Sequence, residues 1–339
     1  MNLQPLVVCW GMGQDSTGML IGLRDRGIRP ELIIVADVGS ERPETYAFRP
    51  IFDDWLESVG FPRSVTVRYQ PQDYKHWPPY RTLLENCLTN STLPSLAYGF
   101  HACSSKWKIA PISSFISGLS WAREWWAEGG KILKAIGFDD SPHERRRAER
   151  GCQTFAIQND EKEKYELWFP LQQWGWTRED CVQAIHSAGL PVPPKSSCYF
   201  CPAIKPFEID TLGRRELEII VVLEARARQR HLDHAEAKGW PRGEGVPLCE
   251  GLWRRRVKGC RGAIPKPGSI TEYIVEKGLL SSGEVDRLIA ATPTEPLTCN
   301  DFERLGFNDW QHWLEAICNP PLEAVGLPVG TGCESNTNE

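Results

Sequence analysis

The chain has 339 residues, of which 41% are hydrophobic and 24% are charged, and its formal net charge is −5 at pH 7. This length allows one large domain or two ordinary ones, and the composition is sufficient for a buried core. Because its net charge is negative, the chain does not attract polyanions through its overall charge. No apolar run is long enough to span a membrane, and the N-terminus lacks the features of a signal peptide.

The first half of the chain alternates between strand and helix patterns. Helices are predicted from residue 17 onward and at 43–59, 80–88 and 103–116, followed by a tryptophan-rich segment at 121–126. Apolar runs typical of buried strands lie at residues 6–9, 32–36, 64–69, 131–137 and 165–169. Strands separated by helices predict an α/β fold with a doubly wound parallel sheet of about five strands. Ligands of such sheets bind at the carboxyl ends of the strands.

The pattern changes after the fifth strand. Helices are predicted at 177–188, 207–232, 284–291 and 300–317, and the segment after Leu327 has the composition of a disordered tail. We therefore predict a nucleotide-binding domain at 1–205, a mainly helical C-terminal region at 206–327 and a tail at 328–339.

A glycine loop joins the first strand to the first helix. Gly11 and Gly13 lie in this loop, and Asp15, Ser16 and Thr17 close it at the expected helix start. Glycines let the backbone approach an anion, and the helix start offers unpaired N–H groups and a positive dipole end. The loop lacks the spacing of both the Walker A motif and the GxGxxG motif. The sequence therefore predicts a phosphate site of another kind.

Polar residues and glycines also follow other strands. Asp37 follows the second strand, where a carboxylate commonly binds a ribose hydroxyl or a nearby cation, although an acid that caps a helix is the alternative. Gly137 follows the fourth strand and precedes a polar loop with His143 and Arg145, which are candidates for contact with substrate or phosphate, as are Asp139 and Asp140. These residues are expected to meet the glycine loop at one crevice.

Cys198 and Cys201 form a CxxC pair in a loop between two prolines. This spacing lets two thiolates reach one metal ion or cluster, and a redox pair or half of a zinc site is compatible with it. Because twelve cysteines are scattered over a long chain without a recognisable signal peptide, we expect a cytoplasmic protein with reduced thiols.

Four segments in order resemble the PP-loop ATP pyrophosphatase superfamily, specifically the phosphoadenosine-phosphosulfate (PAPS) reductase-like branch of the adenine nucleotide α-hydrolases. They are WGMGQDST at 10–17, ADVGSERPETYAF at 36–48, HACSSKWKIAPI at 101–112 and KSSCYFCP at 195–202. The resemblance covers about residues 5–230 and implies a Rossmann-like, HUP-type fold. The chain departs from the branch's SGGxDS loop at Gly11, which replaces a serine, and at Met12, which replaces a glycine.

The resemblance implies a role for several residues. ATP would bind at the loop through Gly11, Gly13, Ser16 and Thr17, with Ser16 donating to a phosphate. Asp15 would organise the loop or help to place Mg²⁺, and Lys108 would reach the phosphates.

It also implies a metal centre. In related enzymes a cysteine at the position of Cys103 joins the late CxxC pair on a [4Fe–4S] cluster. Here Cys103, Cys198 and Cys201 would leave one iron open, or Cys249 or Cys260 would supply a fourth ligand. Zinc is the alternative metal.

The function implied is adenylylation of a substrate for sulfur transfer. Analogues of this kind modify nucleic acid, for instance the ATP pyrophosphatases of DNA phosphorothioation and the tRNA-thiolating enzymes, and a cysteine desulfurase would be a sulfur donor. The basic cluster at 254–261 is compatible with a nucleic-acid contact. The alternatives are a phosphoadenylylsulfate or adenylylsulfate reductase, suggested by LCEGLW at 248–253, and a nucleotide-binding regulatory or defence protein without turnover.

Overall fold

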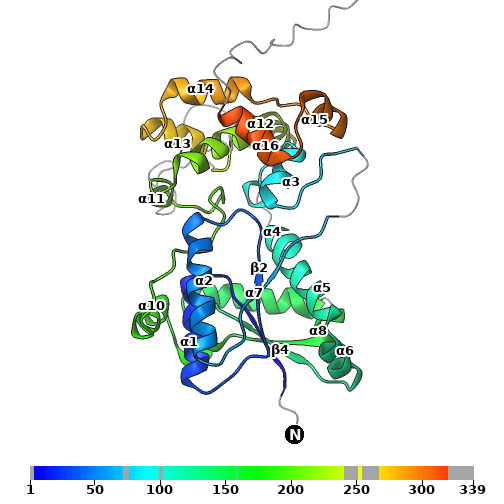
Figure 1. Cartoon of the computed structure of the whole chain (residues 1–339), viewed down its shortest axis with the longest axis vertical. Helices are drawn as coiled ribbons and strands as arrows, with labels where there is room; N and C mark the ends of the chain where they lie inside the picture. Colours follow the sequence, from blue (N-terminus) through cyan, green and yellow to red (C-terminus); the bar gives the residue numbers. More distant parts are fainter. Residues whose placement is uncertain are drawn as a thin grey trace, which may run out of the picture. The chain divides into compact units, whose positions relative to one another are not determined.

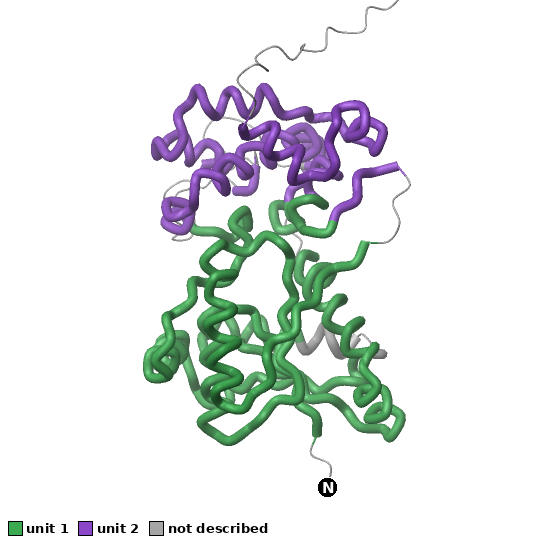
Figure 2. Tube along the Cα trace, viewed as in Figure 1, with its two compact units in different colours: residues 1–72, 81–86, 94–205 green, residues 73–80, 87–93, 206–339 purple. Residues whose placement is uncertain are grey.

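The computed structural model describes residues 4–71, 76–98, 102–157, 159–239, 251–253 and 267–319. Figure 2 shows two compact units, of which the first comprises residues 1–72, 81–86 and 94–205. The second comprises residues 73–80, 87–93 and 206–339. The chain passes from the first unit to the second after residue 205. Two short segments of the N-terminal half, 73–80 and 87–93, also belong to the second unit. The tail at 328–339 lies outside the described residues.

The first unit is built on a five-stranded parallel sheet with the strand order β3-β2-β1-β4-β5 (Figure 1). Helices cover both of its faces, so the predicted doubly wound, Rossmann-like α/β fold is confirmed. The strands are Leu6–Cys9 (β1), Leu32–Ala36 (β2), Val65–Val67 (β3), Ile132–Ile136 (β4) and Tyr165–Trp168 (β5). Each lies within the segment that the sequence predicts for it. Val8 in β1 is aligned with Ile33 in β2 and with Ala135 in β4.

The helices of this region follow the expected α/β alternation. They are Gln14–Asp25 (α1), Pro43–Ser58 (α2), Leu83–Thr89 (α3), Ser95–Tyr98 (η1, a 3₁₀ turn), Ala102–Ser104 (α4), Ser105–Ile109 (η2, a π-helical turn), Ala110–Gly118 (α5), Ser120–Ala127 (α6), Pro142–Ile157 (α7), Asn159–Lys164 (α8), Pro170–Trp174 (α9) and Arg178–Ser187 (α10). Helix α10 begins after a capping box formed by Thr177 and Asp180.

Helices cover both faces of the sheet, and successive side chains of a strand point to opposite faces. Neighbouring residues of one strand are therefore buried in two different cores. Leu6 and Val8 of β1 join the core on the α1, α2 and α10 side. Val7, between them, joins the core that contains Ile112 of α5 and Ala122 of α6. All three β1 side chains are at most 4% exposed, which explains the continuous apolar run in the sequence.

Three local predictions are wrong. The segment after β4 was expected to be a polar loop, but α7 begins at Pro142, so His143 lies in a helix. Proline suits a first helical turn because its missing N–H has no partner there. The helix predicted at 207–232 is interrupted, and the one predicted at 300–317 breaks at Gly306, whose φ of 74° is left-handed.

The second unit is helical. Its helices are Pro206–Ile209 (α11), Arg214–Ala237 (α12), Ile270–Glu276 (α13), Ser282–Ala291 (α14), Cys299–Leu305 (α15) and Trp310–Cys318 (α16). Helix α12 carries a buried carboxylate, Glu224, which accepts hydrogen bonds from the N–H groups of Leu252, Ile270 and Thr271. It thereby caps the start of α13 and fixes the segment 251–253.

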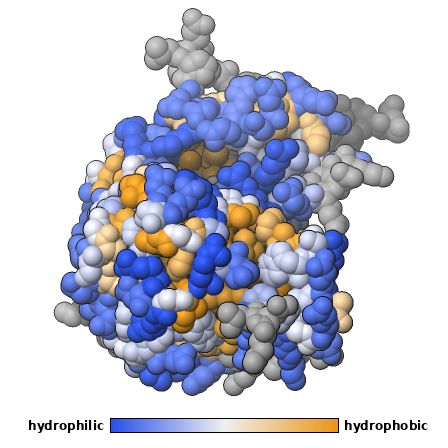
Figure 3. All heavy atoms as spheres, turned by 60° about the horizontal axis from the view of Figure 1, so that its bottom comes forward, coloured by the Kyte–Doolittle hydropathy of each residue, from blue (hydrophilic) through white to orange (hydrophobic). Residues whose placement is uncertain are grey.

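The surface carries no continuous apolar belt on the face drawn in Figure 3, where hydrophilic side chains surround smaller hydrophobic areas. None of the helices that the structure describes combines the length and the apolar character needed to cross a bilayer.

The packing of α1 on α10 depends on a glycine. A Cβ added at Gly18 would lie 2.6 Å from Cys181 Cβ and 2.8 Å from its Cα, so Gly18→Ala is expected to destabilise the protein by about 1–3 kcal/mol. Urea denaturation measures the change. Gly151→Ala is the control, because that helical glycine in α7 has no atom within 4 Å of the added Cβ and its replacement should stabilise by about 0.5–1 kcal/mol. Equal effects of the two substitutions would contradict the packing argument.

Candidate functional site

The candidate site lies where the strand order reverses, at the carboxyl ends of β1 and β4. The glycine loop follows β1, and Gly137 follows β4. A Cβ at Gly137 would lie 2.7 Å from Ser16 Cα and 2.9 Å from Ser16 N. The backbone after β4 therefore rests directly on the first turn of α1, as the sequence predicts, and only glycine fits at this approach. This is the crevice in which doubly wound folds bind ligands.

Two buried side chains hold the glycine loop. Trp10 is 1% exposed and Met12 is 2% exposed, whereas Gly11 between them is exposed. The indole N–H of Trp10 donates to Thr17 Oγ1 over 3.0 Å, so the side chain of Thr17 points into the core. Met12 has a φ of 59°, the left-handed conformation that glycine adopts without strain. The loop thus keeps the backbone shape of a glycine while its methionine side chain is buried.

The first turn of α1 is open to an anion. Ser16 Oγ accepts a hydrogen bond from Gly11 N–H over 3.1 Å, which closes the loop on itself. Gly13 is the N-cap residue, and among the described residues no side chain caps this helix. The first-turn N–H groups of a helix have no partner within the helix, so they are available to a phosphate here.

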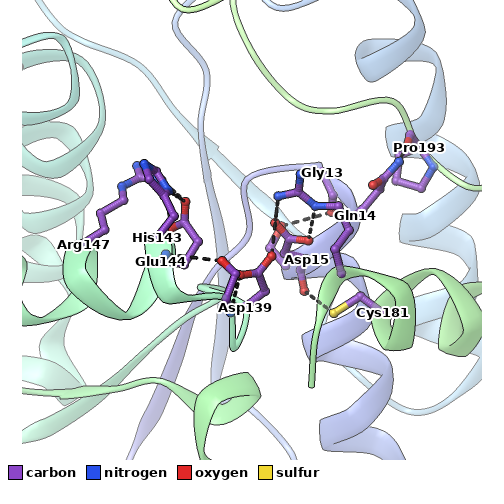
Figure 4. A network of polar contacts seen from close by, with 12 residues as sticks. Gly13, Gln14, Asp15, Asp139, His143, Glu144, Arg147, Cys181 and Pro193 are labelled. Carbon is purple, nitrogen blue, oxygen red and sulfur yellow. Dashed lines mark hydrogen bonds and ion pairs between the residues drawn. The ribbon is translucent and has the colours of Figure 1, made fainter. Parts of the chain in front are cut away.

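Asp15 belongs to a charge network at the mouth of the crevice. Its two carboxylate oxygens accept hydrogen bonds from Arg178 Nε at 3.0 Å and Nη2 at 2.7 Å. Arg178 also lies 3.8 Å from Asp139 Oδ2, so one guanidinium links the starts of α1 and α10 to the loop after β4. Figure 4 shows Asp15 and Asp139 on facing segments, with Gln14 reaching toward Pro193. Asp15 thus joins the start of α1 to α10 through Arg178, and both of its predicted roles stay predictions.

Asp37 is fully engaged with protein groups. Tyr46 Oη and Gly39 N–H donate to Oδ1, and Arg68 donates twice to Oδ2, at 2.9 and 2.6 Å. Burial raises the pKa of Asp37, but these hydrogen bonds and the charge of Arg68 lower it by more, so its pKa lies below the ordinary value. The ribose contact stays a prediction.

Lys108 lies on the π-helical turn η2 and pairs with a carboxylate that the sequence analysis missed. Its Nζ donates to Glu41 Oε1 over 3.2 Å, and 40% of the lysine side chain is exposed. Burial alone would lower the pKa of Lys108, but Glu41 and the nearby thiols of Cys198 and Cys201 raise it above the ordinary value. Lys108 is therefore a protonated cation at neutral pH.

The CxxC loop packs against both the glycine loop and Glu41. A Cβ at Gly13 would lie 3.2 Å from Ser196 N, and Ser196 Oγ donates to Glu41 Oε2 over 3.1 Å. Cys198 forms an isolated antiparallel bridge with Glu41. The structure thus brings the late cysteine motif to the edge of the predicted nucleotide crevice.

Burial shifts the thiols of this loop toward their protonated form. Burial, followed by the charge of Glu41, raises the pKa of Cys198 well above its ordinary value, and burial also raises that of Cys201. Cys103 on α4 also raises the pKa of both thiols, as a smaller cause, and its Sγ lies 3.0 Å from Ser95 Oγ. Within the described residues, no three Cys, His, Asp or Glu side chains converge into a preformed metal site. The cysteines supply the donors that zinc or an iron–sulfur cluster requires.

Other predicted residues are placed less centrally. Arg145 is 55% exposed and pairs with Asp140, and His143 is 76% exposed and pairs with Glu144. Cys260 and the basic cluster at 254–261 lie outside the described residues.

Glu41, Ser196 and Arg178 were missed by the sequence analysis. Glu41 and Ser196 lie inside motifs that it singled out, but nothing in the residue pattern shows that they meet. Neither a family model nor a curated protein sequence matches this chain.

The environment of Asp37 yields a pH-dependent prediction. Because its folded-state pKa is lowered, its contacts stabilise the protein at neutral pH, and this stabilisation is lost as the pH falls below about 4. Asp37→Asn should lower the free energy of unfolding by about 1–3 kcal/mol at pH 7, with a smaller loss at pH 3. Asp54→Asn, at an exposed pair with Arg63, is the control. A loss independent of pH would contradict this reading, and urea titrations at the two pH values measure it.

Proposed function

We propose that this chain is an ATP-pyrophosphatase-type enzyme that adenylylates a substrate for sulfur transfer, with nucleic acid as the substrate class. The observation that carries the proposal is the contact of the CxxC loop with the glycine loop, through Ser196 and Gly13. A phosphate site and a pair of thiols at one crevice are the two parts that such a reaction needs.

The proposed chemistry has two steps. A substrate oxygen attacks the α-phosphate of ATP, the α–β bond breaks, and pyrophosphate leaves. Sulfur then attacks the activated carbon or phosphorus centre, and AMP leaves with the oxygen. The first-turn N–H groups of α1 would bind phosphate oxygens, and Lys108 would offset charge on the leaving pyrophosphate, as would Mg²⁺ bound with the nucleotide.

Cys103, Cys198 and Cys201 would hold the metal centre of this enzyme. A [4Fe–4S] cluster with three cysteine ligands would supply an open iron that binds sulfide, and Zn²⁺ is the alternative. The chain would also position these groups. Glu41 bridges Cys198 through its backbone and accepts a hydrogen bond from Lys108, so it links the CxxC loop to the lysine.

The nucleotide role of Lys108 is tested by pyrophosphate release. With ATP, Mg²⁺ and a mixture of DNA and tRNA, Lys108→Ala should lower kcat by about 100-fold or more, because a cation is removed from the developing charge. Lys106→Ala is the matched control from the same π-helical turn, because Lys106 lies over the rings of Tyr69 and Trp107, and it should keep wild-type turnover.

Other outcomes would support the alternatives. Sulfite formation from phosphoadenylylsulfate without pyrophosphate release from ATP would favour the reductase. Binding of ATP by calorimetry without any turnover would favour a regulatory or defence protein.

The metal centre is tested by analysis of anaerobically purified protein. Iron and acid-labile sulfide are expected, and Cys198→Ser should lose both, whereas Cys299→Ser in α15 should keep them. Because burial raises the pKa values of the thiols, binding of added Zn²⁺ should strengthen from pH 6.5 to pH 8.5 as protons are released more easily. Zinc without sulfide would support the alternative metal, and absence of any bound metal would contradict the proposed centre.

A further inference from the structure

Glu41 is a buried charged side chain at the crevice. Only 1% of it is exposed. One carboxylate oxygen accepts from Lys108 Nζ at 3.2 Å, and the other accepts from Ser196 Oγ at 3.1 Å. Its own N–H donates to Tyr46 Oη at 3.2 Å, and its backbone bridges Cys198. Three separate segments of the chain therefore meet at this residue, namely its own, the turn with Lys108 and the CxxC loop.

A buried carboxylate is stable only when its charge is paired and its oxygens accept hydrogen bonds. The two donors to Glu41 come from the two elements that carry the proposed chemistry, namely the π-helical turn with Lys108 and the CxxC loop with Ser196. Glu41 caps no helix, because α2 begins after Arg42. Its contacts therefore serve the crevice and not the start of the neighbouring helix.

The ammonium group of Lys108 keeps room for a second partner. It has three N–H donors, and Glu41 accepts one of them. Since 40% of the lysine side chain is exposed, the remaining donors can reach an anion in the crevice while the first holds the group in place. Fixing a flexible lysine in advance lowers the entropy that is lost when the phosphate binds.

We infer that Glu41 is a positioning residue that holds Lys108 and the CxxC loop in one arrangement, so that the cation and the cysteines lie at the same crevice. This inference rests on the proposed function. Glu41 itself would not contact the substrate. It would affect the rate of pyrophosphate release by positioning Lys108.

The test compares Glu41→Gln with Lys108→Met and with the double variant, in pyrophosphate release from ATP. Glutamine keeps the shape of the side chain but loses its charge, so kcat should fall by about tenfold or more, with KM for ATP changed by less than about threefold. Because Glu41 acts through Lys108, the double variant should be within about twofold of Lys108→Met alone. Glu44→Gln is the matched control from the same segment, since that side chain is 56% exposed, and it should keep wild-type kcat.

Thermal melting checks that each variant is folded. If Glu41→Gln does not fold, Ser196→Ala removes one donor from the same network and should lower kcat by about threefold to tenfold. Additive effects in the double variant, an unchanged kcat in Glu41→Gln, or an equal loss in Glu44→Gln would overturn the inference while the proposed function stands. Absence of pyrophosphate release from the wild-type protein, with ATP and each nucleic acid, would overturn the proposed function and the inference together.

Discussion

The position of β1 at the centre of the parallel sheet is the constraint on which the site depends. Because β1 pairs with β2 on one side and β4 on the other, the loops that leave β1 and β4 meet at one edge. The approach of Gly137 to Ser16 follows from this pairing, and it leaves no room for a side chain. The buried side chains of Trp10 and Met12 then fix the loop between them without occupying the open end of α1.

Three carboxylates at the crevice are paired with cations of the protein itself. Asp15 pairs with Arg178, Asp37 with Arg68, and Glu41 with Lys108. Each carboxylate is more buried than its cation, so the acids are held by the fold and the cations lie nearer to solvent. Under the proposed function, an incoming anion would meet guanidinium and ammonium groups that are already oriented by these pairs. Binding of the anion would then require each cation to donate to two partners at once. Lysine and arginine can do so because each has several N–H donors.

Apolar periodicity located all five strands, because buried parallel strands are the strongest local signal in an α/β chain. It failed where polar residues form helices, as after Pro142, and where one glycine interrupts a helical pattern, as at Gly306. The site was predicted as separate motifs. Its pairings, such as Glu41 with Lys108 across 67 residues, depend on tertiary contacts that no local spacing records.

The proposed ATP pyrophosphatase and the alternative reductase differ in what they require of the segment at 251–253. A reductase of the suggested kind would present a cysteine beside this segment to the bound nucleotide. Here Trp253 is 1% exposed and packs on Tyr273, and the N–H of Leu252 is held at 2.7 Å by the buried carboxylate of Glu224. Releasing the segment would remove one donor from that carboxylate, which Ile270 and Thr271 also contact, at a cost of about 1–3 kcal/mol. The CxxC loop already contacts Glu41 at the crevice, through the bridge at Cys198. The proposed sulfur chemistry at Cys198 and Cys201 would leave these contacts of Glu224 intact.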